Sequence, residues 1–201
     1  MDVVVINHLT LDGVMQAPGG ADEDRRGGFA HGGWAVPGND EVMGRVLAEG
    51  MGQGGSLLFG RRTYEQFFGF WPTQTGNPFT EVLDRTRKYV ASTTLTEPLP
   101  WGRSTLLHGD ARTAVAELRE QEGGDLTVLG SGVLVQALMQ HDLVDRFVLM
   151  VHPLVLGSGR RLFPDEGPTT PLRLLDSLTT TTGVTIATYQ PANRTAPSPG
   201  S

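Results

Sequence analysis

The chain has 201 residues, of which 38% are hydrophobic and 19% are charged, and these are values typical of a single globular domain. Its formal net charge of −6 argues against general binding to nucleic acid or to an anionic membrane surface. It contains no cysteine, which excludes disulfides, thiolate metal sites and cysteine nucleophiles. No apolar run approaches the roughly 20 residues of a membrane span, and the first residues do not resemble a signal peptide, so we expect a cytoplasmic protein.

The beginning of the chain predicts a strand followed by a long loop. Residues 3–6 form a β-branched run, which predicts a strand buried on both faces, and Asp12-Gly13 predicts a turn after it. The segment from 14 to 37 is rich in glycine and charge and shows no sustained period, which is typical of a functional or mobile loop. Its aromatic residues Phe29 and Trp34 either line a pocket or anchor the loop to the core.

The rest of the chain alternates helices with strands and ends in two successive strands. We expect helices over 41–50, 61–69, 78–85, 111–121 and 133–139, and strands over 56–60, 88–92, 104–107, 125–129, 144–151, 172–180 and 184–190. This order predicts an α/β fold, a mostly parallel central sheet flanked by helices with an antiparallel C-terminal hairpin. We expect one domain over 1–190 and a disordered tail over 191–201.

The first candidate site is the junction at Gly60, where a strand runs into a helix. Such a junction presents free backbone N–H groups and the positive end of a helix dipole at the carboxyl edge of the strand. Arg61, Arg62 and Thr63 add charged and hydroxyl donors there. The combination suits a phosphate group. The same residues are also compatible with an ordinary capped helix on the surface.

A second junction of this kind follows the strand at 125–129. Gly130-Ser131-Gly132 precedes a helix beginning at Val133, but Val135 stands where a Rossmann fingerprint has its third glycine. A phosphate site and a purely structural turn are both open here. Ligands of parallel α/β sheets bind beyond the carboxyl ends of the strands, where both junctions lie. The chain has no Walker A and no G-x-S-x-G sequence, which argues against P-loop enzymes and α/β hydrolases.

The histidines do not suggest a metal site. The chain has five, scattered along the sequence without an i, i+3 or i, i+4 pair. His152, next to Pro153 at a strand end, is expected to be structural. Arg160-Arg161 follows a glycine-rich turn and either binds an anion or is a solvated part of that turn.

Several of these segments together resemble one family. The matching segments are Leu9–Gly13, Leu58–Glu65, Val90–Ser92, Leu129–Gly132, Leu143–Asp145 and Pro153–Phe163, in the family's order over roughly residues 3–190. The chain resembles the dihydrofolate-reductase-like superfamily, and more closely its branch with the reductase domain of bacterial riboflavin biosynthesis.

The resemblance implies that NADPH is the hydride donor. It implies that Gly60, Arg61, Arg62 and Thr63 hold the cofactor phosphates and that Ser92 lies near the 2′-phosphate. It also implies that Gly130, Ser131, Gly132 and Val133 meet the pyrophosphate. Asp12, Gly13 and Trp34 would lie at the nicotinamide and substrate end. Family analogy further implies a homodimer.

The substrate is implied only as a class. The resemblance suggests a heteroaromatic molecule, either pterin-like or ribosylaminopyrimidine-like, as in the reduction of 5-amino-6-(5-phosphoribosylamino)uracil at a C=N or C=O group. Asp12 and Asp40 are the candidate catalytic residues, although a helix N-cap explains Asp40 better. The zinc-binding deaminase half of the riboflavin enzymes is not found in this chain. The alternative function is a non-catalytic NADPH-binding or regulatory module of the same fold.

Overall fold

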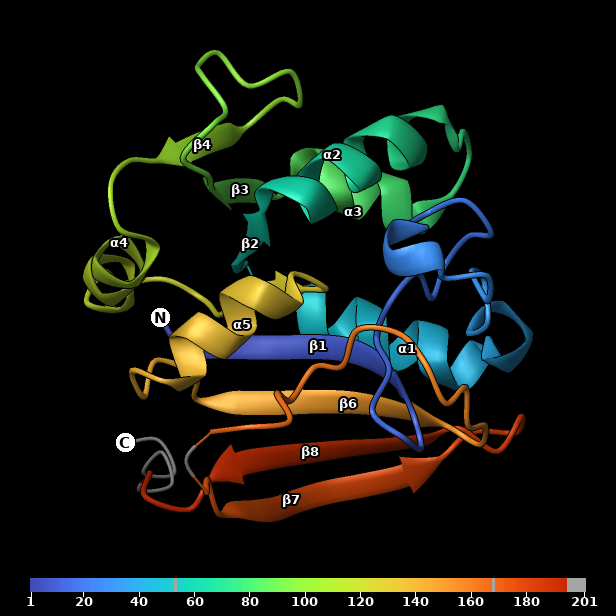
Figure 1. The fold of residues 1–201 in the computed structure, drawn as a ribbon. Coiled ribbons are helices and arrows are strands. Elements are labelled where there is room, and N and C mark those ends of the chain that lie inside the picture. The colour runs from blue at the N-terminus through green and yellow to red at the C-terminus, as the bar shows by residue number, and fades with distance from the viewer. Residues whose placement is uncertain (53, 168, 195–201) are drawn as a thin grey trace.

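The computed structural model describes residues 1–52, 54–167 and 169–194, which form a single eight-stranded sheet with helices packed on it (Figure 1). The order across the sheet is β4-β3-β2-β5-β1-β6-β8-β7. The strands are β1 (Val3–Thr10), β2 (Ser56–Gly60), β3 (Arg87–Ala91), β4 (Ser104–Leu107), β5 (Leu126–Leu129), β6 (Arg146–His152), β7 (Leu172–Thr179) and β8 (Thr185–Pro191). Strands β1 to β6 pair in parallel, whereas β8 pairs antiparallel with β6 and β7. The predicted fold class is confirmed.

Five α-helices and three short 3-10 turns connect the strands. They are α1 (Glu41–Gly52), α2 (Arg61–Phe70), α3 (Pro78–Arg85), α4 (Ala111–Arg119), α5 (Gly132–Met139), η1 (Arg26–Gly28), η2 (Val36–Gly38) and η3 (Trp71–Thr73). Every predicted helix is present, with its ends within two residues of the prediction. Two predicted caps are also present, since Asn77 accepts a hydrogen bond from Phe79 N and Asp110 accepts from Arg112 N and Thr113 N.

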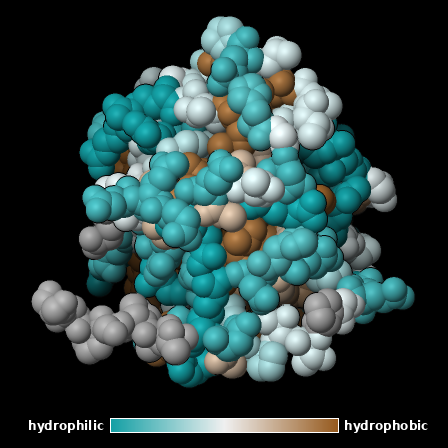
Figure 2. Space-filling model, turned by 90° about the vertical axis from the view of Figure 1, so that its left-hand side faces the viewer, coloured by the Kyte–Doolittle hydropathy of each residue, from teal (hydrophilic) through white to brown (hydrophobic). Residues whose placement is uncertain are grey.

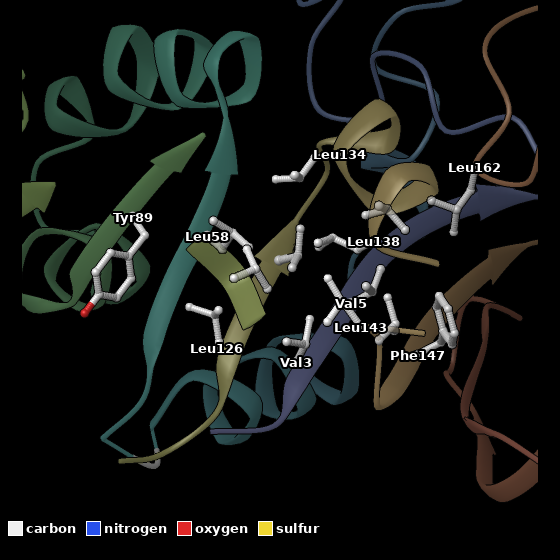
Figure 3. Close-up of a cluster of buried hydrophobic side chains, with 14 of the residues drawn as sticks. Val3, Val5, Leu58, Tyr89, Leu126, Leu134, Leu138, Leu143, Phe147 and Leu162 are labelled. Atoms are coloured by element: carbon white, nitrogen blue, oxygen red, sulfur yellow. The ribbon is translucent and has the colours of Figure 1, made fainter. Parts of the chain in front are cut away.

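The helices cover both faces of the sheet, and the side chains of β1 alternate between the two layers. Val3, Val5 and Leu9 pack in a cluster with residues of α4 and α5. Figure 3 shows Val3 and Val5 in this cluster with Leu134 and Leu138 of α5. Val4 and Ile6 belong to a second cluster, which includes residues of α1, α2 and α3. The β-branched run therefore is buried on both faces, as predicted. The strand continues past this run to Thr10, because residues 4–10 pair with β6.

The loop after β1 is packed on the body of the protein. Val14, Ala17 and Phe29 are buried in a small cluster of their own, with Trp34 partly buried against them. Trp34 Nε1 donates a hydrogen bond to Gln16 O at 2.7 Å. Phe29 therefore anchors the loop, which is one of the two roles considered for it.

The C-terminal hairpin forms the edge of the sheet, with Gly183 in the turn at φ +85°. The predicted tail over 191–201 lies mostly outside the described residues; Arg194, within them, forms an ion pair with Asp145 at 2.7 Å. Figure 2 shows the side of the molecule at the amino ends of the parallel strands, and it is mainly hydrophilic. Among the described residues, no helix has the length and apolar character needed to cross a membrane.

Candidate functional site

The two glycine junctions predicted from the sequence lie side by side. Gly60 N donates a hydrogen bond to Ser131 Oγ at 2.9 Å, and Ser131 N donates to Thr63 Oγ1 at 3.1 Å. These contacts join the start of α2 to the start of α5, although the residues are about seventy positions apart in the chain. Both helices begin at the carboxyl edge of the parallel strands, which is where ligands bind in sheets of this kind.

Neither helix start at this edge carries a side-chain cap. Gly60 precedes α2 and Ser131 precedes α5, and neither makes a side-chain hydrogen bond to the first turn. Helices α1, α3 and α4 are all capped by a side chain. The N–H groups of the first turns of α2 and α5 are therefore not taken by a side-chain cap, and both helix dipoles favour negative charge at this edge of the sheet. We call this pair of helix starts the double N-terminus.

Gly130 is required for the close approach of the two junctions. Its φ is +56°, and a Cβ added there would lie 3.1 Å from Thr63 Cγ2. Asn7 Nδ2 donates to Gly130 O at 3.1 Å, which fixes the second junction to β1. A Cβ at Gly132 would lie only 2.5 Å from Met15 Sδ, so the loop after β1 reaches the start of α5.

The remaining predicted cofactor residues surround the double N-terminus. Arg61 NH1 pairs with Glu65 at 3.1 Å, and Arg62 is exposed. Ser92 follows Ala91, which pairs with Gly60 in the sheet, and its hydroxyl accepts hydrogen bonds from Thr94 N and Leu95 N. Val133 is 75% exposed in the first turn of α5. All of these residues therefore lie at the carboxyl ends of the parallel strands.

A cavity of about 340 Å³ lies beside the start of α2. It is lined by Glu23, Asp24, Arg25, Arg26, Arg62, Glu65 and Gln66. Two of its arginines pair with aspartates of the same loop, Arg25 with Asp22 and Arg26 with Asp24. The loop after β1 forms one wall, since Gln66 donates a hydrogen bond to Glu23 O.

Asp12 connects two loops and is not arranged as a proton donor. Its carboxylate accepts hydrogen bonds from the Thr10 hydroxyl at 2.5 Å, from Leu156 N at 3.2 Å and from Gly157 N at 2.8 Å. The Thr10 hydroxyl above all, with the two backbone N–H groups, lowers the pKa of Asp12 to about 2. Its geometry therefore does not support the predicted catalytic role.

Gly13 lies in the turn after Asp12, with φ +80°. Arg161 Nε donates to Asp12 O at 2.8 Å, so this arginine supports the turn. Of the two roles considered for Arg160-Arg161, the contacts of Arg161 favour the structural one.

Asp40 is the N-cap of α1. Its Oδ1 accepts from Met43 N at 2.9 Å, and its Oδ2 accepts from the backbone and hydroxyl of Thr181. The bond from Met43 N, followed by the Thr181 hydroxyl, lowers the pKa of Asp40. Of the two roles considered for this residue, the geometry supports the cap and gives no support to catalysis.

The structure also brings together two histidines that sequence reasoning left apart. His8 Nδ1 and His152 Nε2 are 2.9 Å apart at the carboxyl ends of β1 and β6, and the Trp34 ring meets His152 edge-on with centroids 5.2 Å apart. The two histidines are 144 positions apart, so no local spacing relates them. Among the described residues, no group of three or more His, Asp or Glu side chains is arranged to hold a metal ion.

A model of the RibD C-terminal domain matches residues 2–186 of the chain. The protein belongs to the RibD C-terminal domain family. The match covers β1 to β7 in full and only the start of β8, and the family has a reductase-like fold. The predicted resemblance is confirmed at this level.

Two curated proteins are similar to this chain in sequence. The uncharacterized protein YyaP of Bacillus subtilis is 26% identical over 186 residues, which is 90% of each chain. The uncharacterized protein YwjB of the same organism is 37% identical over 70 residues, 35% of this chain and 40% of the relative.

Among solved structures, a putative riboflavin biosynthesis protein from Shewanella has a TM-score of 0.72 at 23% identity, covering 95% of this chain and 99% of the other. A pyrimidine reductase-like protein from Corynebacterium diphtheriae has a TM-score of 0.66 at 13% identity, covering 96% and 92%. These similarities show that the chain shares its fold with the two solved structures.

Proposed function

We propose that this protein is an NADPH-dependent reductase of a heteroaromatic small molecule, either pterin-like or ribosylaminopyrimidine-like. The observation that carries the proposal is the double N-terminus, in which α2 and α5 start side by side without side-chain caps. Two free helix starts at the carboxyl edge of a parallel sheet suit the paired phosphates of a dinucleotide. Members of the family typically bind a nicotinamide cofactor, which agrees with this arrangement.

The residues at the double N-terminus fit such a cofactor. The two helix starts contact each other through Gly60, Thr63 and Ser131. Thr63 lies so close to Gly130 that a larger residue at position 130 has no room. Arg61 and Arg62 offer positive charge on the β2 side, and the exposed segment after Ser92 lies next to them. This basic side supports NADPH, which carries one more phosphate than NADH. When bound, the cofactor supplies a hydride, and the protein has to align and shield the reacting atoms.

The substrate end of the proposed site lies at the carboxyl ends of β1 and β6. The loop after β1 lies at this end with Trp34, and its aromatic ring suits a flat ring system. The two similar solved structures are a putative riboflavin biosynthesis protein and a pyrimidine reductase-like protein, and this likeness favours a nitrogen heterocycle as the substrate class. We further propose that the protein is a cytoplasmic homodimer.

A second candidate function is an NADPH-binding module without catalysis. The engagement of Asp12 and Asp40 in structural hydrogen bonds favours it, because neither carboxylate is free to supply a proton. Binding of the cofactor without turnover of any substrate distinguishes this module from the reductase.

The test is a fluorescence titration of the purified protein with NADPH and, separately, with NADH. We expect saturable binding with a preference for NADPH. Thr63→Val keeps the volume of the side chain and removes the hydroxyl that holds Ser131 N, so it should weaken binding several-fold. The matched control Thr105→Val lies on the edge strand β4, away from this edge contact, and should bind normally. Absence of binding to either nucleotide would refute the proposal. If NADPH binds, the second assay measures its oxidation in the presence of dihydrofolate or a ribosylaminopyrimidine. Oxidation supports the reductase, and binding without oxidation supports the non-catalytic module.

A further inference from the structure

His8 and His152 form a hydrogen-bonded pair to which phosphate binding gives no role. The parallel register of β1 and β6 places His8 opposite Met150 and Thr10 opposite His152, so both rings lie on the same face of the sheet. His8 Nδ1 lies 2.9 Å from His152 Nε2. One of these two nitrogens donates and the other accepts, so each ring restricts the tautomer of the other.

The pair has an inner and an outer member. His152 is 2% exposed, and a Cβ on Gly38 would lie 2.6 Å from its Nδ1, so the loop closes over this ring. The edge-on contact with Trp34 holds it from another side. His8 is only partly buried. Its Nδ1 is taken by His152, and within the described residues its Nε2 has no hydrogen-bond partner. The pair leaves His8 Nε2 and His152 Nδ1 without a protein partner among the described residues, and His8 is the less buried of the two rings, so we take its Nε2 as the nitrogen that a ligand meets.

The position of His8 relative to the double N-terminus follows from the strand order. Asn7, the residue before His8, donates to Gly130 O at the second junction. Strands β5, β1 and β6 are neighbours, and strands in a sheet lie about 4.8 Å apart, so the pair lies one to two strand spacings from that junction. The basic residues Arg61 and Arg62 lie on the opposite, β2 side. If NADPH binds with its 2′-phosphate beside Arg61 and Arg62, its nicotinamide end points toward β1 and β6.

We propose that His8, held in orientation by His152, is the proton donor of the reduction, an inference that rests on the proposed reductase function. Reduction of a C=N or C=O bond adds a hydride to carbon and a proton to nitrogen or oxygen. The hydride and its electron pair come from the dihydronicotinamide, which is oxidised. The His8 Nε2–H bond breaks, its electrons stay on the ring, and the proton forms the new N–H or O–H bond. His8 changes from imidazolium to neutral imidazole and regains its proton from water. His152 acts through His8 and is a positioning residue.

The electrostatic surroundings set the pH range in which His8 can act as a proton donor. Burial, followed by the charge of His152, lowers the pKa of His8 to about 4, and burial also lowers the pKa of His152. No carboxylate contributes to either shift. Asp12 and Asp40 belong to the loops beside the pair, but their oxygens bind Gly157 and Thr181. The imidazolium of His8 is therefore a better proton donor than that of an ordinary histidine, but it is populated only at low pH, so we expect the rate of reduction to rise as the pH falls toward 4.

The test follows the histidine ring nitrogens by NMR in the full-length protein with isotope-labelled histidine. In the free protein we expect His8 to titrate well below its ordinary range, and in His152→Leu its ring should lose the fixed tautomer. His152→Gln, which keeps a polar partner, should restore it. The surface variant His141→Gln is the control and should leave the signals of His8 unchanged.

The decisive step compares two probes, NADP⁺ and adenosine 2′,5′-bisphosphate, which lacks the nicotinamide. Backbone amide signals of Gly130 and Ser131 report occupation of the double N-terminus by either probe. We expect the His8 ring signals to shift with NADP⁺ and not with the bisphosphate. If both probes move Gly130 and His8 responds to neither, the proton-donor proposal is wrong while the cofactor site stands. If neither probe moves Gly130, the proposed function fails and the inference fails with it.

Discussion

Gly130→Ala tests whether the close approach of the two helix starts serves a ligand. An alanine at this position must keep the left-handed backbone, φ +56°, at a cost of about 1–2 kcal/mol. Its Cβ would also lie 3.1 Å from Thr63 Cγ2 and 3.3 Å from Thr63 Oγ1. Thr63 then has to move away from Ser131 N, which costs about 1 kcal/mol more. We expect the free energy of unfolding to fall by about 2–3 kcal/mol.

Gly76→Ala is the matched control for backbone strain. Gly76 has φ +73°, but nothing lies within 4 Å of a Cβ there. We therefore expect Gly76→Ala to lower the free energy of unfolding only by the roughly 1–2 kcal/mol that the left-handed backbone costs an alanine. The difference between the two variants isolates the contact with Thr63.

The assay pairs urea unfolding with NADPH titration for both variants. Movement of Thr63 and Ser131 spreads the two helix starts, so Gly130→Ala should weaken NADPH binding tenfold or more, which is about 1.4 kcal/mol. Gly76→Ala should bind as the parent protein does. A folded Gly130→Ala protein with the parent's affinity would show that this junction is only structural, and the argument from the double N-terminus would be refuted.

Three further predictions address charge. Arg61→Ala should weaken NADPH binding several-fold through loss of a charge-assisted contact, whereas Glu65→Gln, which only releases Arg61 from its partner, should not weaken it. Lys88→Met should lower the free energy of unfolding by about 2–4 kcal/mol in urea, because Nζ of this fully buried lysine donates to three carbonyl oxygens. The depressed pKa of His8 means that the unfolded chain binds the extra proton, so stability should fall as the pH drops from about 6.5 to about 4, by as much as about 3 kcal/mol. His8→Phe should remove that part of the pH dependence, and an unchanged profile would contradict the assignment.

Local patterns were sufficient to predict the elements and the candidate cofactor edge. Asn77-Pro78 and Asp110 signal helix starts through chemistry that acts within three residues, and both were correct. The two glycine junctions could be placed together because the carboxyl ends of parallel strands meet at one edge of a sheet. That rule needs only the order of strands and helices along the chain.

The roles of Asp12 and His152 could not be predicted in the same way. The partners of Asp12, Leu156 and Gly157, are 144 and 145 positions away, and His8 is 144 positions from His152. These contacts exist because β6 pairs with β1, and strand neighbours are chosen by the packing of the whole sheet. A histidine close to a proline at a strand end therefore looked structural, and only the register of β1 and β6 shows that it meets a second imidazole.

Gly60→Asp asks why α2 begins without a side-chain cap. Gly60 has φ −76° and ψ 156°, which any residue adopts, and a Cβ there would make only ordinary contacts, at 3.8 Å from Ser131 and 3.9 Å from Leu134. An aspartate can therefore occupy the N-cap and should raise the free energy of unfolding by about 0.5–1 kcal/mol. It should also weaken NADPH binding tenfold or more, because its carboxylate takes the N–H groups and the dipole end that a phosphate needs. Gly44→Ala, in the middle of α1 with open space around it, should stabilise by a similar amount and leave binding unchanged. If Gly60→Asp stabilises the protein and binds NADPH normally, the uncapped start of α2 is not used for the cofactor. A gain in stability coupled to a loss of binding would show that the helix is left uncapped for its ligand.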